Sequence, residues 1–226
     1  MIKKFITLFK LGRKIASSDI LEIISKFQKP PLAITLLFKF LSISFSSKKK
    51  LSNKSQGERL SDSLETMGTT FIKLGQFLAT RPDIIGDSLS KQLENLQDKL
   101  PPFSLIEAKD IIKSDLGLDT FNSIVNLSEP VAAASIAQVH KAQINDNGTL
   151  KDVAIKILRP NIKKIFNDEI DAMMLFAFII ESFIKKTKRL KLVEVVFLLK
   201  EITNLEMDLR FEAAAANEYA ENTKND

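Results

Sequence analysis

The sequence predicts an α+β fold in which a small antiparallel sheet stands between mostly helical regions. Two runs of strand type, 136–144 and 153–158, flank a turn at 145–148, which is the pattern of a β-hairpin. Apolar residues recur every three or four positions before this hairpin, over 61–80, and helical patterns return after it, from 162 onward. We therefore expect helices packed on a small sheet, with a long helix closing the chain.

Composition limits the kinds of site that the chain can hold. A length of 226 residues allows one or two domains, and 45% hydrophobic with 27% charged residues is ordinary for a soluble globular chain. The absence of cysteine excludes disulfides, thiolate nucleophiles and thiolate zinc sites. The single histidine, His140, excludes a multi-histidine metal centre, and we expect it to be a structural residue of a strand.

The N-terminal part of the chain is strongly basic. Residues 1–60 contain 13 Lys and Arg against 3 Asp and Glu, a balance of +10, so that the remainder carries −5. Residues 1–45 predict amphipathic helices broken at Pro30-Pro31, and a solvated linker follows over 46–56. Their lysines lie among Leu, Ile and Phe without a nucleic-acid motif, which favours an anionic membrane surface over nucleic acid as the partner.

No membrane-spanning or secretory segment is expected. The apolar run 32–45 is too short to cross a bilayer and contains Lys39. Lys10, Arg13 and Lys14 interrupt the apolar core that a signal peptide would need. A peripheral protein that is not secreted is the resulting prediction.

A helical block is expected over 61–116. Its breaks are predicted at Arg81-Pro82, Pro101-Pro102 and Gly117. Ser104 with Glu107 has the spacing of a capping box, so that a helix should begin after Pro102.

The segment 61–80 is read as one amphipathic helix. It carries an apolar stripe with helical spacing, formed by Leu64, Met67, Phe71, Leu74 and Leu78. Lys73 and Gln76 fall on the opposite side, where a solvated polar face and a face that closes over a pocket are both possible. Gly68 and Gly75, two turns apart, should let another element approach closely.

Lys156 is the residue of the hairpin that points to chemistry. It lies inside the second strand, and a lysine in a central strand needs an anion. The small-residue loop Ala132-Ala133-Ala134-Ser135 precedes the first strand. A loop over phosphates, a hairpin and a V-A-I-K lysine are the parts with which a protein-kinase-like N-lobe holds a nucleotide. On the last helix, expected over about 190–219, Glu212 is the candidate partner of this lysine, and Asp208 should share its face. An exposed edge-strand lysine and ordinary surface acidity are the alternatives.

Five segments, in order, resemble the UbiB family of atypical kinase-like proteins linked to ubiquinone biosynthesis. The run 68–83 (GTTFIKLGQFLATRPD) resembles the KxGQ segment of that family, and the resemblance extends over about 61–220. The other four are LQDKLPPF at 96–103, AAASIAQVH at 132–140, VAIK at 153–156 with Arg159-Pro160 after it, and the ExD motif at 206–208.

The resemblance implies a kinase-like N-lobe and a division into a basic extension (1–56), KxGQ helices (57–120) and the N-lobe (121–226). Lys156 would bind phosphates, Glu212 would orient it, and the loop Ala132, Ala133, Ala134 and Ser135 would cover ATP or ADP with Mg2+. A family-specific lid would be formed by Lys73, Gly75, Gln76, Glu206 and Asp208. The implied setting is ubiquinone biosynthesis at the cytoplasmic face of the inner membrane, with proteins of that pathway or lipid as partners.

The parts that complete phosphoryl transfer are not found in this sequence. Residues 213–226 contain neither an Asp-x-x-x-x-Asn catalytic loop nor Asp-Phe-Gly, so we expect no catalytic residue, no metal ligand and no C-lobe here. Weak or no nucleotide binding by the chain alone follows. A split gene, a truncation, a remnant and a separate C-lobe polypeptide are all compatible with this. A non-catalytic, membrane-peripheral helical scaffold is the alternative function.

Overall fold

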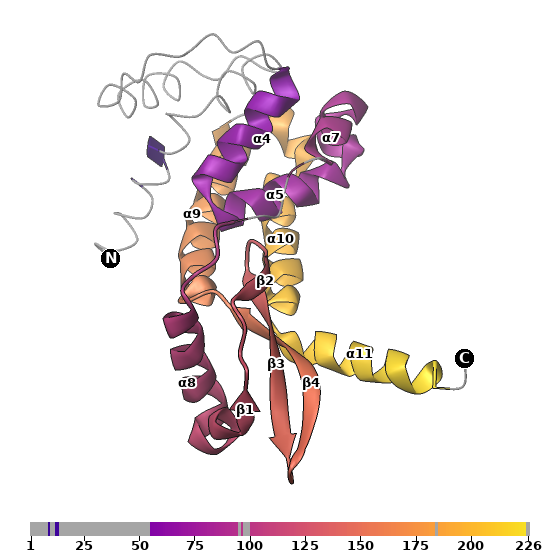
Figure 1. Cartoon of the computed structure of the whole chain (residues 1–226). Helices are drawn as coiled ribbons and strands as arrows, with labels where there is room; N and C mark the ends of the chain where they lie inside the picture. Colours follow the sequence, from indigo (N-terminus) through magenta and orange to yellow (C-terminus); the bar gives the residue numbers. More distant parts are fainter. Residues whose placement is uncertain are drawn as a thin grey trace. The chain divides into compact units, whose positions relative to one another are not determined.

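The computed structural model (Figure 1) describes residues 9, 12–13, 55–94, 96, 100–183 and 185–224. The basic helices and linker expected over 1–56 therefore lie almost entirely outside the described residues. The chain divides into two compact units, one formed by 1–97 with 164–202 and the other by 98–163 with 203–226. In the residues that the structure describes, the first unit is helical, and the second contains the sheet. The three-segment division by sequence stays a prediction.

Four short helices come first in the described part of the helical unit, namely α4 (Gln56–Met67), α5 (Thr69–Ala79), α6 (Pro82–Ile85) and α7 (Asp87–Leu93). A capping box begins α4, because the Ser55 hydroxyl accepts from the Glu58 N–H at 3.2 Å and the Glu58 carboxylate accepts from the Ser55 N–H at 2.6 Å. The break expected at Arg81-Pro82 is confirmed, since α6 begins at Pro82. Helix α5 packs against both α4 and α7.

The prediction of one continuous helix over 61–80 is wrong. The helix breaks at Gly68, whose φ of 102° ends α4 and begins α5. A Cβ at Gly68 would meet nothing within 4 Å, so the close approach expected there is also wrong. Glycine is needed at this position for its backbone conformation, which residues with a Cβ rarely adopt.

Gly75, in contrast, allows the close approach that its spacing predicts. A Cβ at this position would overlap Leu96 Cδ2 and lie 2.7 Å from Leu64 Cδ1. Leu64 and Phe71 of the predicted stripe are buried, whereas Leu74 and Leu78 are only half-buried. The break at Gly68 rotates α5 relative to a continuous helix, and this change buries Thr70 and Ile72 instead.

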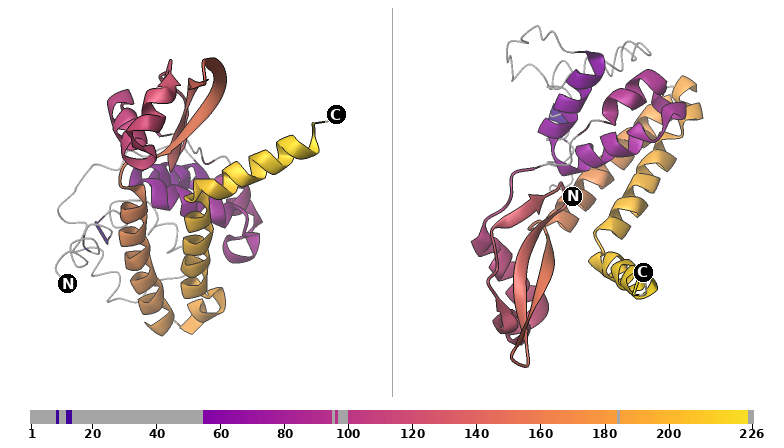
Figure 2. Two further views of the ribbon diagram at one scale, coloured as in Figure 1. Left: turned by 90° about the horizontal axis from the view of Figure 1, so that it is seen from below. Right: turned by 45° about the vertical axis from the view of Figure 1, so that its right-hand side comes forward.

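Two longer helices follow, α9 (Ile162–Phe183) and α10 (Leu192–Glu206), joined by the 3-10 helix η1 (Lys185–Leu190). Figure 2 shows them side by side as a helical hairpin. The Val193 N–H donates to Glu181 Oε1 at 3.2 Å across the corner. Buried residues of α9 recur with helical spacing, at Phe166, Ile170, Met173 and Ala177. None of the described helices is long and apolar enough to cross a bilayer.

The second unit contains the small antiparallel sheet that the sequence predicts, and its described part has four strands. Its strands are β1 (Ile124–Val125), β2 (Pro130–Ala133), β3 (Ala137–Asp146) and β4 (Thr149–Leu158). Both β1 and β2 pair with β3 on one side, and β4 pairs with β3 along its whole length on the other. Therefore β3 is the central strand of the described sheet, and β4 is an edge strand.

The β3–β4 hairpin closes in a tighter turn than the four residues expected. Only Asn147 and Gly148 lie between the strands, with φ of 52° and 87°. Positive φ at both positions is the requirement of a two-residue type I′ turn, which favours Asn-Gly. The strands are consequently longer than predicted, and they form the long hairpin visible in Figure 1.

Helix α8 (Leu105–Ser123) packs on the sheet through a small core. Ala108 and Ile112 of α8 are buried with Ile157 of β4. The predicted capping box is present, since the Ser104 hydroxyl accepts from the Glu107 N–H at 3.2 Å. The predicted break at Gly117 is also present as a kink, with φ of 81° inside the helix.

The single long helix expected over about 190–219 is wrong. Helix α10 ends at Glu206, and α11 (Leu209–Asn222) begins after Asp208. Asp208 is the N-cap of α11, and its side chain accepts from the Arg210 N–H at 3.2 Å. An aspartate that bonds to the backbone two residues later stabilises a helix start rather than a helix interior.

Candidate functional site

The side chain of Lys156 projects from β4 and pairs with a carboxylate of α11. Its ammonium donates to Glu212 Oε1 at 2.9 Å and to Glu212 Oε2 at 2.6 Å. The structure therefore brings together the lysine and the glutamate that the sequence singled out, although they lie 56 positions apart.

The setting of Lys156 differs from the one expected. The sequence predicts Lys156 in a central strand, but in the described part of the sheet β4 is an edge strand, and its register places Lys156 opposite Val139. The side chains of Lys156 and Glu212 are 37% and 58% exposed. Burial therefore does not force this lysine to take an anion. An exposed ion pair contributes little to stability and leaves the ammonium accessible to a further anion.

Glu212 owes its position to the start of α11. It lies in the first turn of that helix, where the helix dipole favours a negative charge. The expectation that Asp208 shares a helical face with Glu212 is wrong, because Asp208 caps the helix from outside its first turn.

The carboxylate of Asp208 is held by Arg210. Arg210 Nε donates to Asp208 Oδ1 at 2.8 Å, and Arg210 Nη2 donates to Oδ2 at 2.5 Å. These guanidinium bonds lower the pKa of Asp208 to about 2, against the opposing effect of desolvation. The third acidic residue of the predicted set, Glu206, is exposed at the end of α10.

The alanine-rich segment is part strand and part turn. Ala132 and Ala133 belong to β2, so the expectation that they lie in a loop is wrong, whereas Ala134 and Ser135 lie in the connection to β3. The Ala134 N–H donates to the Ala137 carbonyl at 2.8 Å and closes this connection tightly. The pairing of β2 with β3 therefore extends almost to the turn.

Arg159 also contributes to the structure of the β2–β3 connection, a role that the sequence did not indicate. It directly follows β4, and its guanidinium donates to the Ala134 carbonyl from Nε at 2.9 Å and from Nη2 at 2.7 Å. It also donates to Pro101 O at 2.9 Å and to Leu100 O at 3.2 Å. In the sequence, the Arg159-Pro160 pair is only a mark of family resemblance. Its hydrogen-bond partners lie too far away along the chain for spacing to indicate them.

A buried polar network on β3 bonds to the segment before α8. Gln138 and His140 of β3 are fully buried. The Gln138 side chain accepts from the Phe103 N–H at 2.9 Å and donates to the Phe103 carbonyl at 3.1 Å. It also donates to His140 Nε2 at 2.9 Å, while His140 Nδ1 lies 2.8 Å from the Ser128 carbonyl.

These partners assign the tautomer of His140. Because a carbonyl only accepts, Nδ1 carries the proton, and Nε2 accepts from the Gln138 amide. The prediction that His140 is a structural strand residue is confirmed by its burial and by these two bonds.

The lid residues belong to different units of the chain. Lys73, Gly75 and Gln76 lie on α5 in the helical unit, where Gly75 is buried and the other two are half-buried. Glu206 and Asp208 belong to the unit with the sheet. The expected approach of Lys73 and Gln76 to these carboxylates stays a prediction.

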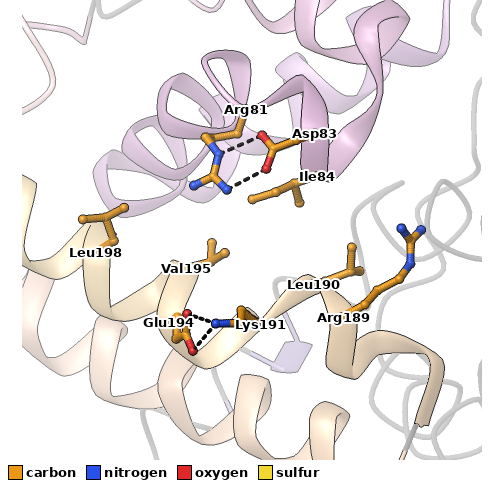
Figure 3. Close-up of a pocket in the computed structure, with 9 residues that line it drawn as sticks. All are labelled: Arg81, Asp83, Ile84, Arg189, Leu190, Lys191, Glu194, Val195 and Leu198. Carbon is orange, nitrogen blue, oxygen red and sulfur yellow. Dashed lines mark hydrogen bonds and ion pairs between the residues drawn. The ribbon is translucent and has the colours of Figure 1, made fainter.

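A cavity of about 320 Å3 lies in the helical unit (Figure 3). Its walls combine apolar residues of η1 and α10 with two ion pairs, Arg81–Asp83 and Lys191–Glu194. It contains none of the predicted nucleotide-binding or lid residues, although Arg81 and Asp83 belong to the segment 68–83 that resembles the KxGQ segment. Within the described part of the chain, no group of three or more His, Asp or Glu residues could hold a metal ion.

Residues 95–226 match the ABC1 atypical kinase-like domain family. Three similar curated proteins carry the name "Probable protein kinase UbiB". The protein of Marinobacter nauticus is 39% identical over 76% of this chain and 31% of its own length. That of Vibrio cholerae serotype O1 is 38% identical over 76% of this chain and 32% of its own. That of Shewanella baltica is 37% identical over 83% of this chain and 34% of its own.

The chain thus spans about a third of the length of the curated relatives that it matches. No solved structure matches it significantly. The family match covers more than half of the chain, and it includes the sheet, the alanine-rich segment, Lys156 and Glu212. The chain therefore belongs to the UbiB family of ABC1 atypical kinase-like proteins.

Proposed function

We propose that the chain supplies the nucleotide-binding lysine, its glutamate and the covering loop of a UbiB-type protein that supports ubiquinone biosynthesis. The observation that carries this proposal is the pair between Lys156 and Glu212, in which one ammonium bonds to both carboxylate oxygens. In kinase-like lobes such a lysine binds the α- and β-phosphates while a helix glutamate orients it.

The residues around Lys156 suit a nucleoside di- or triphosphate. Its ammonium is partly exposed, and Glu212 neutralises it without enclosing it. The β2–β3 connection at Ala134 and Ser135 would cover the phosphates. Ala134 restricts the backbone more than a glycine would, so this cover should adapt less to the nucleotide. The described residues contain no cluster of three or more acidic or histidine side chains that could hold a metal ion, so Mg2+ would need ligands from elsewhere.

The lid is proposed to control access to this site. Lys73 and Gln76 would face Glu206 and Asp208 and would cover the position at which a protein substrate binds in ordinary kinases. Asp208 already accepts two guanidinium bonds from Arg210, so Lys73 would have to compete with Arg210 for this carboxylate.

The catalytic groups are proposed to come from sequence that this chain does not contain, either in the same protein or in a separate C-lobe polypeptide. One feature of α11 supports such a partner. None of its 14 residues is buried, and Phe211 and Tyr219 are 60% and 72% exposed. The same exposed helix suits the second candidate function, a non-catalytic scaffold that binds another protein at the membrane.

A matched pair of lysines on β4 gives the test of the nucleotide site. Lys156→Ala removes the proposed phosphate ligand, whereas Lys151→Ala removes an exposed lysine that pairs with Asp146. The variants would be made in the chain itself and in a chimera that continues into the C-terminal two-thirds of the Marinobacter nauticus relative. Titration with ADP and Mg2+ measures binding.

We expect weak binding by the chain alone and tighter binding by the chimera. Lys156→Ala should abolish the binding, and Lys151→Ala should leave it unchanged. A folded chimera that binds no nucleotide, beside a relative that does, would contradict the proposal and favour the scaffold.

The basic N-terminal part is proposed to bind the cytoplasmic face of the inner membrane peripherally. Its +10 balance over residues 1–60 supports this, because each Lys or Arg near an anionic surface contributes about 1 kcal/mol. Sedimentation with anionic and neutral vesicles measures the binding. We expect binding to anionic vesicles alone, weakening as salt is added. Salt-insensitive binding, or none, would contradict the membrane proposal.

A further inference from the structure

Arg159 joins the connection between β2 and β3 to the end of β4. Its guanidinium donates twice to the Ala134 carbonyl, at 2.9 and 2.7 Å, and its backbone N–H donates to the Ile136 carbonyl at 2.9 Å. The Ala134 N–H is engaged as well, by the Ala137 carbonyl at 2.8 Å. Both polar backbone groups of Ala134 are therefore fixed, at the point where β2 turns into the connection.

The same guanidinium reaches a second segment. Nη1 donates to Pro101 O at 2.9 Å and Nη2 donates to Leu100 O at 3.2 Å. Pro101 and Leu100 lie 58 and 59 positions before Arg159 in the sequence. These two residues lie shortly before the capping box at Ser104 that begins α8. The connection is thereby tied to a segment that α8 and the buried Gln138 also hold in place.

Only arginine can make this set of bonds. A guanidinium presents five N–H donors in a fixed planar fork, and three carbonyls of two segments use four donor contacts here. Lysine would keep the positive charge but has one nitrogen, which cannot span the carbonyls of Ala134 and Pro101 in this geometry. Charged donors also strengthen each bond to a carbonyl.

We propose that Arg159 is a positioning residue that holds the β2–β3 connection in its phosphate-binding conformation, although it does not touch the nucleotide itself. The inference deepens the proposed nucleotide site and rests on it. Glycine loops close over phosphates through their own conformational freedom. This connection begins with Ala134 and contains no glycine, and Arg159 holds it in shape from the end of β4.

The first test needs no nucleotide. Amide hydrogen exchange of the 226-residue chain would be compared among the wild type, Arg159→Lys and Arg159→Ala, with Lys151→Ala on β4 as the control. Both Arg159 variants should speed amide exchange at Ala134 by about tenfold. Loss of roughly one charge-assisted hydrogen bond makes local opening easier by about this factor. Exchange at the β3–β4 pairs Ala142–Val153 and Lys141–Ala154 should not change.

Chemical rescue separates positioning from general stability. Millimolar methylguanidinium should restore slow exchange at Ala134 in Arg159→Ala and should have no effect on Arg159→Lys, whose side chain occupies the space. Unchanged exchange at Ala134 in both variants would overturn the proposal. Accelerated exchange over the whole sheet, without rescue, would also overturn it and assign Arg159 a purely structural role.

The second test uses the chimera and titration with ADP and Mg2+. Arg159→Lys should raise the dissociation constant about tenfold at an unchanged melting temperature, and Lys151→Ala should change neither. Wild-type affinity in Arg159→Lys would overturn the proposal. Absence of binding in the wild-type chimera would contradict the proposed nucleotide site, and the exchange experiment would still decide whether Arg159 orders the connection.

Discussion

The amide nitrogen of Gln138 lies 2.9 Å from Nε2 of His140, and both side chains are fully buried on one face of β3. The same amide bonds to the backbone N–H and carbonyl of Phe103. One glutamine therefore satisfies a histidine of the sheet and both backbone polar groups of Phe103, in the segment before α8. Buried polar groups that lose their partner are costly, because they had to give up water.

Gln138→Leu should accordingly destabilise the chain by about 3 kcal/mol, since it leaves three polar groups without this partner. Denaturant unfolding measures the change in the free energy of unfolding. Gln143→Leu on the same strand is the control. Gln143 makes exposed hydrogen bonds to Asn126 and Asp152, so its loss should cost no more than about 0.5 kcal/mol. Equal effects of the two substitutions would show that the buried network contributes nothing special.

The pair of Lys156 and Glu212 should behave as a functional pair rather than a stabilising one. Because both side chains are partly exposed, Glu212→Gln should change the free energy of unfolding by less than about 1 kcal/mol. ADP affinity of the chimera should fall about tenfold, because the ammonium loses its orienting charge. Glu218→Gln, on the exposed surface of the same helix, should change neither quantity. If Glu212→Gln greatly lowered the free energy of unfolding but left ADP affinity unchanged, the pair would be a stabilising pair and not a functional one.

Local sequence patterns predicted the sheet better than the helix ends. The β3–β4 hairpin followed from its apolar runs and from Asn147-Gly148, since the turn depends on those two residues alone. The prediction of one continuous helix over 61–80 is wrong because the apolar residues keep a spacing of three to four across Gly68, although the backbone leaves the helical conformation there. Asp208 was misplaced for a similar reason, because an N-cap also fits the spacing of a helix face.

The parts of the site that depend on distant contacts were only partly predictable. Lys156 and Glu212 were paired because their residue types and order match a known arrangement, not because spacing requires it. Arg159 and Gln138 bond to backbone groups of Leu100, Pro101 and Phe103. Nearly every residue has the same backbone groups, so a sequence does not indicate which of them will accept or donate such a bond. Tertiary structure alone reveals that these two side chains hold the same segment.

Substitution of Gly75 and of Gly68 by alanine should destabilise the chain for different reasons. Gly75→Ala should cost about 1–3 kcal/mol, because the new methyl group overlaps Leu96 and crowds Leu64. Gly68→Ala should also cost about 1–3 kcal/mol, but through backbone strain at a φ of 102°. Denaturant unfolding of a double-mutant cycle with Leu96→Ala distinguishes the two mechanisms.

Leu96→Ala should partly relieve Gly75→Ala, since it removes the overlapping methyl groups, and should leave the cost of Gly68→Ala unchanged. Equal coupling of both glycines to Leu96 would contradict this separation of packing from strain.

The start of α11 should respond to acid through Asp208. Guanidinium hydrogen bonds from Arg210 lower the pKa of this carboxyl from 3.8 to about 2. Since the folded-state pKa is depressed, the stabilisation is present above the unfolded value and is lost as pH falls through the folded value. The first turn of α11 should therefore fray as the pH falls between those two values. NMR titration of the Asp208 carboxyl carbon, with amide exchange at Arg210, measures both effects.

Arg210→Gln should raise the pKa of Asp208 toward its ordinary value and move the fraying of α11 to higher pH. Asp83 provides an internal control, because its pKa is lowered by hydrogen bonds from Arg81 and should not respond to a change at Arg210. If Arg210→Gln left the titration of Asp208 unchanged, the low pKa would have another source. Lys163 would then be the residue to test, since its charge also favours ionised Asp208.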